Sequence, residues 1–130
     1  MVSLEDVERL VGQLPETEET TKHGRRTWAV GGKGFAWERP FSKADLKRYG
    51  DETPPDGPIL AIRVEDLAEK EAVLAARAGD GFFTIPHFNG YAAVLVQLDK
   101  VPEDVLRDAL LDGWLVYAPA PVAKAHLDGR

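Results

Sequence analysis

Cysteine is absent from this chain of 130 residues. The absence excludes disulfides, thiolate nucleophiles and cysteine-ligated metal sites, and it is typical of a reducing compartment, so we predict a cytoplasmic protein. Histidine is scarce: His23, His87 and His126 lie far apart and show no metal-ligand spacing. A metal site would require His23 and His87 to meet beside a carboxylate. We therefore predict no metal and no cofactor.

Long apolar runs are also missing. No stretch approaches the length of a membrane span, and the acidic start of the chain lacks the pattern of a signal peptide, so we expect no membrane association. The length predicts a single domain over residues 1–130 and suffices for a hydrophobic core. Residues 118–130 are rich in alanine and proline and are expected to form a loosely ordered tail. We expect a monomer.

The densest apolar and aromatic segment spans residues 82–98. Residues 82–85 and 93–98 have the composition of buried strands. The segment 86–91 between them carries His87, Asn89 and Tyr91, and its Asn-Gly pair suits a chain reversal. This loop is therefore the first place to look for a site.

The remaining periodicities predict helices at residues 3–14, 42–49, 65–78 and 102–117, and strands at 27–30, 33–37 and 59–64. Strand alternation places Phe35 and Trp37 on the same face. The order of elements indicates an α+β fold, an antiparallel sheet with helices packed mainly on one face. The side chains expected to join sheet and helices in the core are Trp28, Phe35, Ile62, Phe82, Val94, Val96, Leu106, Leu110 and Trp114.

Charge is distributed unevenly along the chain. Residues 22–48 hold eight basic and two acidic residues, a balance of +6, whereas the rest holds eight basic and twenty acidic residues, a balance of −12. Such asymmetry indicates either a face that meets phosphate groups, as in weak, sequence-tolerant DNA binding, or a solvated hairpin whose cations pair with nearby acids. The residues indicated for nucleic-acid or anion binding are Lys22, Arg25, Arg26, Lys33, Lys43, Lys47 and Arg48.

The aromatic residues around the 86–91 loop favour a second hypothesis, a module that binds a small molecule or a protein. Its groove would be formed by Trp37, Phe83, His87, Asn89 and Tyr91. A histidine at a strand end is more often a structural residue that hydrogen-bonds a backbone carbonyl, and aromatics near core strands usually pack there. No nucleophile motif accompanies His87, so we predict no catalytic residue and favour a non-enzymatic protein.

The two hypotheses meet in one geometric expectation. We expect His87 and Tyr91 to lie near Arg25 or Arg26 at one end of the sheet. A phosphate or carboxylate would then bind between guanidinium and imidazole, with Tyr91 or Trp37 against its organic part.

The order and spacing of these segments resemble the MmcQ/YjbR family of small bacterial proteins. The residues that carry the resemblance are the helix ending at Leu14-Pro15, the stretch 23–37, the run 82–98 with His87, Gly90 and Tyr91, and Trp114 before Ala118-Pro119. The resemblance covers residues 4–120. It implies a double-wing, frataxin-like α+β fold and a role in DNA binding, the latter by fold analogy alone.

Overall fold

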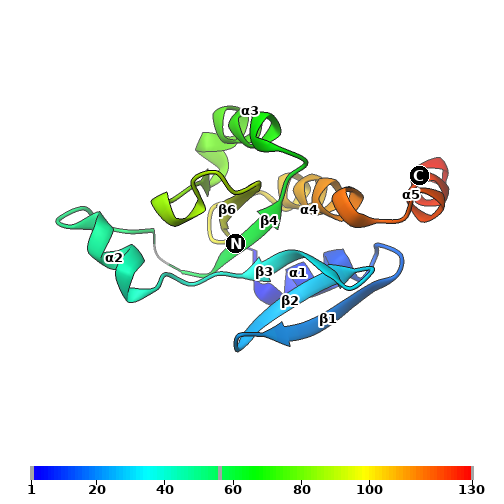
Figure 1. The fold of residues 1–130 in the computed structure, drawn as a ribbon, viewed down its shortest axis with the longest axis horizontal. Helices are drawn as coiled ribbons and strands as arrows, with labels where there is room; N and C mark the ends of the chain where they lie inside the picture. Colours follow the sequence, from blue (N-terminus) through cyan, green and yellow to red (C-terminus); the bar gives the residue numbers. More distant parts are fainter. Residues whose placement is uncertain (1, 56, 130) are drawn as a thin grey trace.

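The computed structural model describes residues 2–55 and 57–129. In these ranges six strands form one antiparallel sheet in the order β1-β2-β3-β4-β6-β5 (Figure 1). The strands are β1 (Thr17–Lys22), β2 (Arg25–Val30), β3 (Lys33–Glu38), β4 (Ile59–Arg63), β5 (Phe82–Phe83) and β6 (Ala93–Gln97). The helices are α1 (Leu4–Val11), α2 (Lys43–Tyr49), α3 (Leu67–Arg77), α4 (Glu103–Tyr117) and α5 (Ala120–Asp128), with the short 3-10 helices η1 (Ala78–Asp80) and η2 (Pro86–Phe88).

Helices α1, α3 and α4 cover one face of the sheet and form the main hydrophobic core with it. All nine side chains expected in this core are buried, none of them more than 4% exposed. The α+β class with an antiparallel sheet is therefore confirmed. Figure 1 shows α2 extending from the sheet on the left and α5 at the opposite end of the molecule. No helix among the described residues has the length and apolar character needed to cross a membrane.

The opposite face of the sheet is covered by different means. Strands β4 and β6 also present apolar side chains there, including Ile59, Ala61 and Leu95. The loop that contains η2 lays Ile85 and Phe88 over them. Further cover comes from the partly buried aromatic rings of Trp37, Phe41 and Phe83. The two central strands are thus buried on both sides, although helices pack on only one.

A β-bulge in β3 changes the face on which its last residues lie. Trp28 pairs with Ala36 but Ala29 pairs with Gly34, which leaves Phe35 as an extra residue. Phe35 and Ala36 both join the core under the helices, whereas Trp37 lies on the other face, beside the η2 loop. The expected alternation, which put Phe35 and Trp37 together, is wrong because the bulge interrupts the period of two.

Both termini of the chain contribute to the fold. Helix α1 begins at the predicted cap, where the Ser3 hydroxyl accepts the Asp6 N–H and the Asp6 carboxylate accepts the Ser3 N–H. At the other end, where a loosely ordered tail is expected, residues 120–128 form helix α5. Pro121 fits its first turn because a proline lacks only an N–H that a helix leaves unpaired there. The His126 ring contacts the Trp114 ring, with their centroids 5.2 Å apart.

Gly113 lets α4 approach the sheet closely. A Cβ at this position would lie 3.0 Å from Ile62 Cγ2 and 3.2 Å from the Arg63 carbonyl oxygen. Neither neighbour can move far, because Ile62 is buried and the carbonyl belongs to the central strand β4. The contact between helix and sheet therefore depends on the absence of a side chain here.

We predict that Gly113→Val lowers the free energy of unfolding by about 1–3 kcal/mol, the usual cost of overpacking a core. Denaturant-induced unfolding measures the change. Gly79→Val is the matched control, because a Cβ there meets nothing within 4 Å. Equal stability of the Gly113 variant and the control would contradict the close-approach argument.

Candidate functional site

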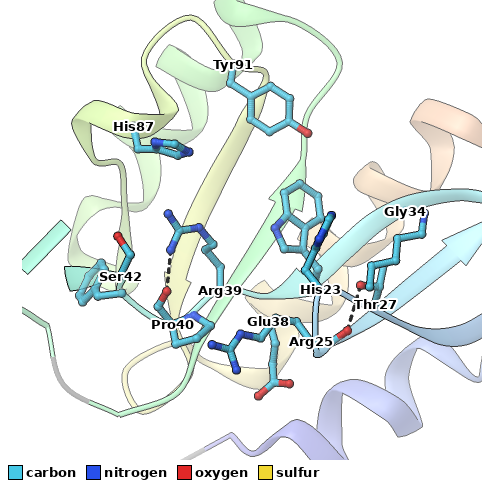
Figure 2. Close-up of a pocket in the computed structure, with 13 residues that line it drawn as sticks. His23, Arg25, Thr27, Gly34, Glu38, Arg39, Pro40, Ser42, His87 and Tyr91 are labelled. Carbon is cyan, nitrogen blue, oxygen red and sulfur yellow. Dashed lines mark hydrogen bonds between the residues drawn. The ribbon is translucent and has the colours of Figure 1, made fainter. Parts of the chain in front are cut away.

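A groove of about 590 Å³ opens on the sheet face that α1 and α4 leave uncovered (Figure 2). Three segments line it. The β1–β2 hairpin contributes Lys22, His23, Arg25 and Thr27, and the η2 loop contributes His87 and Tyr91. The third segment runs along β3 and beyond it, with Gly34, Trp37, Glu38, Arg39, Phe41 and Ser42 among its lining residues.

One wall of the groove is aromatic. The Trp37 and Tyr91 rings lie 6.2 Å apart with a tilt of 55°, and Phe88 supports Tyr91 edge-on at 5.6 Å. Tyr91 is 42% exposed, an unusual value for a large aromatic side chain in contact with two others. Thus the wall offers a planar ligand an accessible aromatic surface that packing already holds in place.

Arg63 supports the same wall from behind. Its guanidinium lies 5.1 Å from the centre of the Tyr91 ring and 5.6 Å from that of Tyr117, and the Lys33 ammonium lies 5.3 Å from the Tyr117 ring. Together with the Trp37 contact, the Arg63 contact restricts the orientation of Tyr91. The Arg63 Nε is buried and has no hydrogen-bond partner among the described residues, so the position of this arginine rests on its stacked rings.

The cations of the groove are of two kinds. Arg39 is tied to helix α2: its Nη2 lies 3.0 Å from the buried Asp45 carboxylate. Burial alone would raise the pKa of the Asp45 carboxyl, but hydrogen bonds with Ser42 and the charge of Arg39 lower it. Arg25 and Lys22 have no ion-pair partner among residues 2–55 and 57–129, and both are exposed. The charge available to a ligand is therefore chiefly theirs.

Two features shape the floor beside these cations. Gly34 leaves space next to Thr27, since a Cβ on this glycine would lie 2.9 Å from the Thr27 methyl carbon. The Glu38 carboxylate accepts the Arg26 backbone N–H at 3.1 Å and adds one negative charge to the lining. Figure 2 shows Glu38 next to Arg25, so this carboxylate partly offsets the positive charge that the groove offers to an anion.

The η2 loop is held by a buried lysine. Lys70 of α3 is only 6% exposed, and its ammonium donates to the carbonyl oxygens of Phe88 at 2.6 Å and Tyr91 at 2.8 Å. These two bonds bracket the turn that presents Tyr91 to the groove. Burial lowers the pKa of Lys70 from its ordinary value of 10.5. The sequence analysis does not single out this residue, because one lysine in a charged helix looks like any solvated one.

The structure brings together part of the predicted site. Arg25, Trp37, His87 and Tyr91 line one groove. Figure 2 shows His87 and Tyr91 on the loop side and Arg25 and Thr27 on the strands across from them, with Arg39 between. Whether the groove binds an anion stays a prediction.

Arg26 points away from this groove. Its guanidinium lies over Trp28 on the helix side of the sheet and donates to Glu19 at 2.8 and 3.0 Å and to Glu8 at 3.1 Å. Adjacent strand residues face opposite sides, so only one of Arg25 and Arg26 can reach the groove. Arg26 is therefore a cation paired with nearby acids and does not contribute to an anion-binding face.

The other predicted residues are dispersed. Lys33 follows the β2–β3 turn, at the end of the hairpin opposite Lys22, while Lys43, Lys47 and Arg48 belong to α2. Phe83 packs against Phe41 on the covered part of the sheet. None of these residues, nor Asn89, lines the groove. The basic residues of segment 22–48 therefore do not form one continuous face.

His23 and His87 do border the same groove, together with Glu38. Among the described residues, however, no three histidine, aspartate or glutamate side chains are placed to hold a metal ion.

The sequence analysis missed Arg39, Phe41 and Ser42 as lining residues. The segment is recognisable only by its composition: an arginine, a proline and an aromatic residue follow a strand directly and precede a helix cap. Because this segment reads as a simple strand break, nothing in it indicates that it turns back over the sheet.

Comparison with known proteins gives consistent matches. A family model described as YjbR matches residues 12–116. "Uncharacterized protein Rv2570" of Mycobacterium tuberculosis and "Uncharacterized protein Mb2600" of Mycobacterium bovis are each 43% identical over 130 residues, covering 98% of this chain and 97% of the relative. The crystal structure of Deinococcus radiodurans protein DR2400, with the family-model domain DUF419, superposes with a TM-score of 0.64 at 21% identity, covering 99% of this chain and 88% of that one.

We predict that Lys70→Met loosens the η2 loop while the sheet stays intact. The substitution removes the charged donor from the Phe88 and Tyr91 carbonyls, which keep only the N–H groups of Tyr91 and Ala93, so amide exchange of Asn89 and Tyr91 should accelerate at least about tenfold, or ~1.4 kcal/mol of local opening. Lys100→Met, at an exposed site, is the control. Unchanged exchange in the loop would show that the lysine does not hold it.

The lowered pKa of Lys70 also predicts a pH dependence. In the window between that pKa and 10.5 the unfolded chain binds the proton more tightly, so the contribution of this lysine to stability rises with pH there. The difference in the free energy of unfolding between the wild type and Lys70→Met should therefore change in favour of the wild type as pH rises toward 10.5. Urea unfolding at several pH values tests this, and a constant difference would contradict it.

Proposed function

The chain belongs to the YjbR family, and from its groove we propose a non-enzymatic binding function for a small ligand that joins a phosphate or carboxylate to a planar ring. The observation that carries the proposal is the convergence of two cations without an ion-pair partner among the described residues, Lys22 and Arg25, with the wall formed by the partly buried Trp37 and the exposed Tyr91. Unpaired cations and accessible aromatic rings are each common on protein surfaces. Their meeting in one concave site is what a ligand with both chemistries requires.

The ligand is oriented by the charge at one end and the rings at the other. Arg25 meets the anionic group with its two-pronged guanidinium, and Lys22 adds a second charge. The ring of the ligand lies against Trp37 and Tyr91, which are held by Phe88 and Arg63. His23 and His87 border the groove and offer ring N–H donors.

Binding is favoured over catalysis by the state of the hydroxyl groups. The Ser42 hydroxyl accepts the Asp45 N–H at 3.1 Å as the cap of α2. Thr27 is only 4% exposed, and its hydroxyl donates to the Arg25 carbonyl oxygen at 3.3 Å. The Asp45 carboxylate that bonds the Ser42 side chain belongs to this helix cap and is also paired with Arg39, and the Thr27 hydroxyl donates to the backbone, so neither hydroxyl is arranged as an activated nucleophile.

We predict that phenyl phosphate binds the groove more tightly than inorganic phosphate and changes the tryptophan fluorescence. Trp37 is the natural reporter, because Trp28 and Trp114 are at most 2% exposed. Arg25→Ala should weaken binding at least about tenfold, the usual scale for losing a charged hydrogen bond. Arg26→Ala is the matched control, since the neighbouring arginine faces the other side. Equal losses in both variants, or no binding to the wild type, would overturn the proposal.

A second candidate is weak binding of single-stranded DNA, whose phosphates and bases offer the same two chemistries. The favouring observation is again Lys22 and Arg25 beside an aromatic wall. With these two as the unpaired cations that line the groove, affinity for an oligonucleotide should fall about 25-fold between about 20 and about 200 mM salt. Absence of binding at low salt, or equal weakening by Lys43→Ala and Lys22→Ala, would remove this candidate.

A further inference from the structure

A second groove lies on the helix side of the molecule, away from the groove lined by Arg25, Trp37 and Tyr91, which we call the ligand groove. The role of the second groove is independent of the proposed function. It runs between α3 and α4 as two clefts of about 490 and 270 Å³. The two clefts share Glu69, Val73, Phe82, Ala109 and Asp112, so they form one continuous depression. In Figure 1 the helices α3 and α4 are neighbours; α3 packs on β5 and β6, and α4 packs on β3 and β4.

The walls of this depression are apolar and incompletely covered. Val73, Ala109 and Leu115 pack on the core but stay partly exposed. On the α3 side, Ala72 and Ala76 are too small to close the gap. The one buried side chain of α3 is that of Lys70, which serves the η2 loop. The apolar side of α3 is therefore left without the cover that helices usually have.

The rims carry negative charge from both helices. Glu65 and Glu69 line the α3 side, and Asp108 and Asp112 line the α4 side. The lining cation, Arg77, stands at one end, where its Nη1 lies 3.5 Å from the Asp80 carboxylate. An apolar strip between acidic rims is complementary to a partner with apolar residues flanked by lysines or arginines.

The dimensions favour an elongated partner. One end of the groove is lined by Val105 and Arg77 and the other by Val116 and Glu65, so α3 and α4 run antiparallel along it. The distance along α4 from residue 105 to 116 is about 16 Å, which is three turns of an α-helix. A small amine would occupy one end only, and an anionic membrane surface would be repelled by the rims.

We propose that this groove, which we call the α3–α4 groove, docks a basic amphipathic helix of a partner protein. The apolar face of that helix lies on Val73, Ala109 and Leu115, and its basic flanks face Glu65, Glu69 and Asp108. This is the helix-in-groove mode of recognition, in which apolar anchors recur every three to four residues.

The test uses the full chain and a labelled 14-residue peptide of leucine and lysine, with leucine at helical spacing, followed by fluorescence anisotropy. Binding should weaken at least about tenfold in the double variant Glu65→Gln and Glu69→Gln. The double variant Glu18→Gln and Glu52→Gln removes the same charge at exposed sites outside the groove and should bind like the wild type. A peptide with serine in place of leucine keeps every charge and should not bind.

Three results would overturn the proposal: no binding of the leucine–lysine peptide, equal weakening in both double variants, or binding of the serine–lysine peptide as tight as that of the leucine–lysine peptide. The last two would reveal attraction to the net charge of −6 alone. Addition of phenyl phosphate should leave peptide binding unchanged, because its groove lies on the other face of the sheet. This measurement separates the docking proposal from the proposed ligand binding, because either one can fail without the other.

Discussion

The central constraint on this fold is that strands β4 and β6 are apolar on both faces while helices cover only one. Ile59, Ala61 and Leu95 would be exposed on the second face without further cover. Burying an aliphatic side chain contributes roughly 1.5–3 kcal/mol, so leaving this face open would remove much of a small domain's stability. This cover consists of the η2 loop and the rings of Trp37, Phe41 and Phe83. The ligand groove begins where this cover ends, beside strands β2 and β3.

Two local devices hold the η2 loop and the Trp37 ring in place on this face. The bulge at Phe35 sends Trp37 to the second face, where a regular strand would have kept it in the main core. The buried ammonium of Lys70 donates a second hydrogen bond to each of two loop carbonyls, which also accept backbone N–H groups. Hydrogen bonds from a charged donor are roughly twice as strong as neutral ones, which offsets the desolvation of the ammonium at this buried position. Together these devices fix Trp37 and Tyr91 as neighbours.

The sequence predicts the fold better than it predicts the site. Periodicity places Trp28, Phe82 and Trp114 in the core because each lies in a regular element with one buried face. The face of Trp37 cannot be predicted, since a single extra residue reverses it and no residue type marks the bulge. Arg25 and Arg26 look alike in the sequence, yet strand alternation gives one to the ligand groove and the other to Glu8 and Glu19. Charge counting along the chain cannot make that distinction.

The central claim is that the incompletely covered face presents a wall of Trp37 and Tyr91 to a planar anion. The most direct test is to record intermolecular nuclear Overhauser effects between the protein and 1-naphthyl phosphate. The structure predicts contacts from the naphthyl protons to the Trp37 and Tyr91 rings, with none to the core rings of Trp28 and Trp114. Contacts confined to another surface, or bound ligand without contacts to Trp37, would contradict the account.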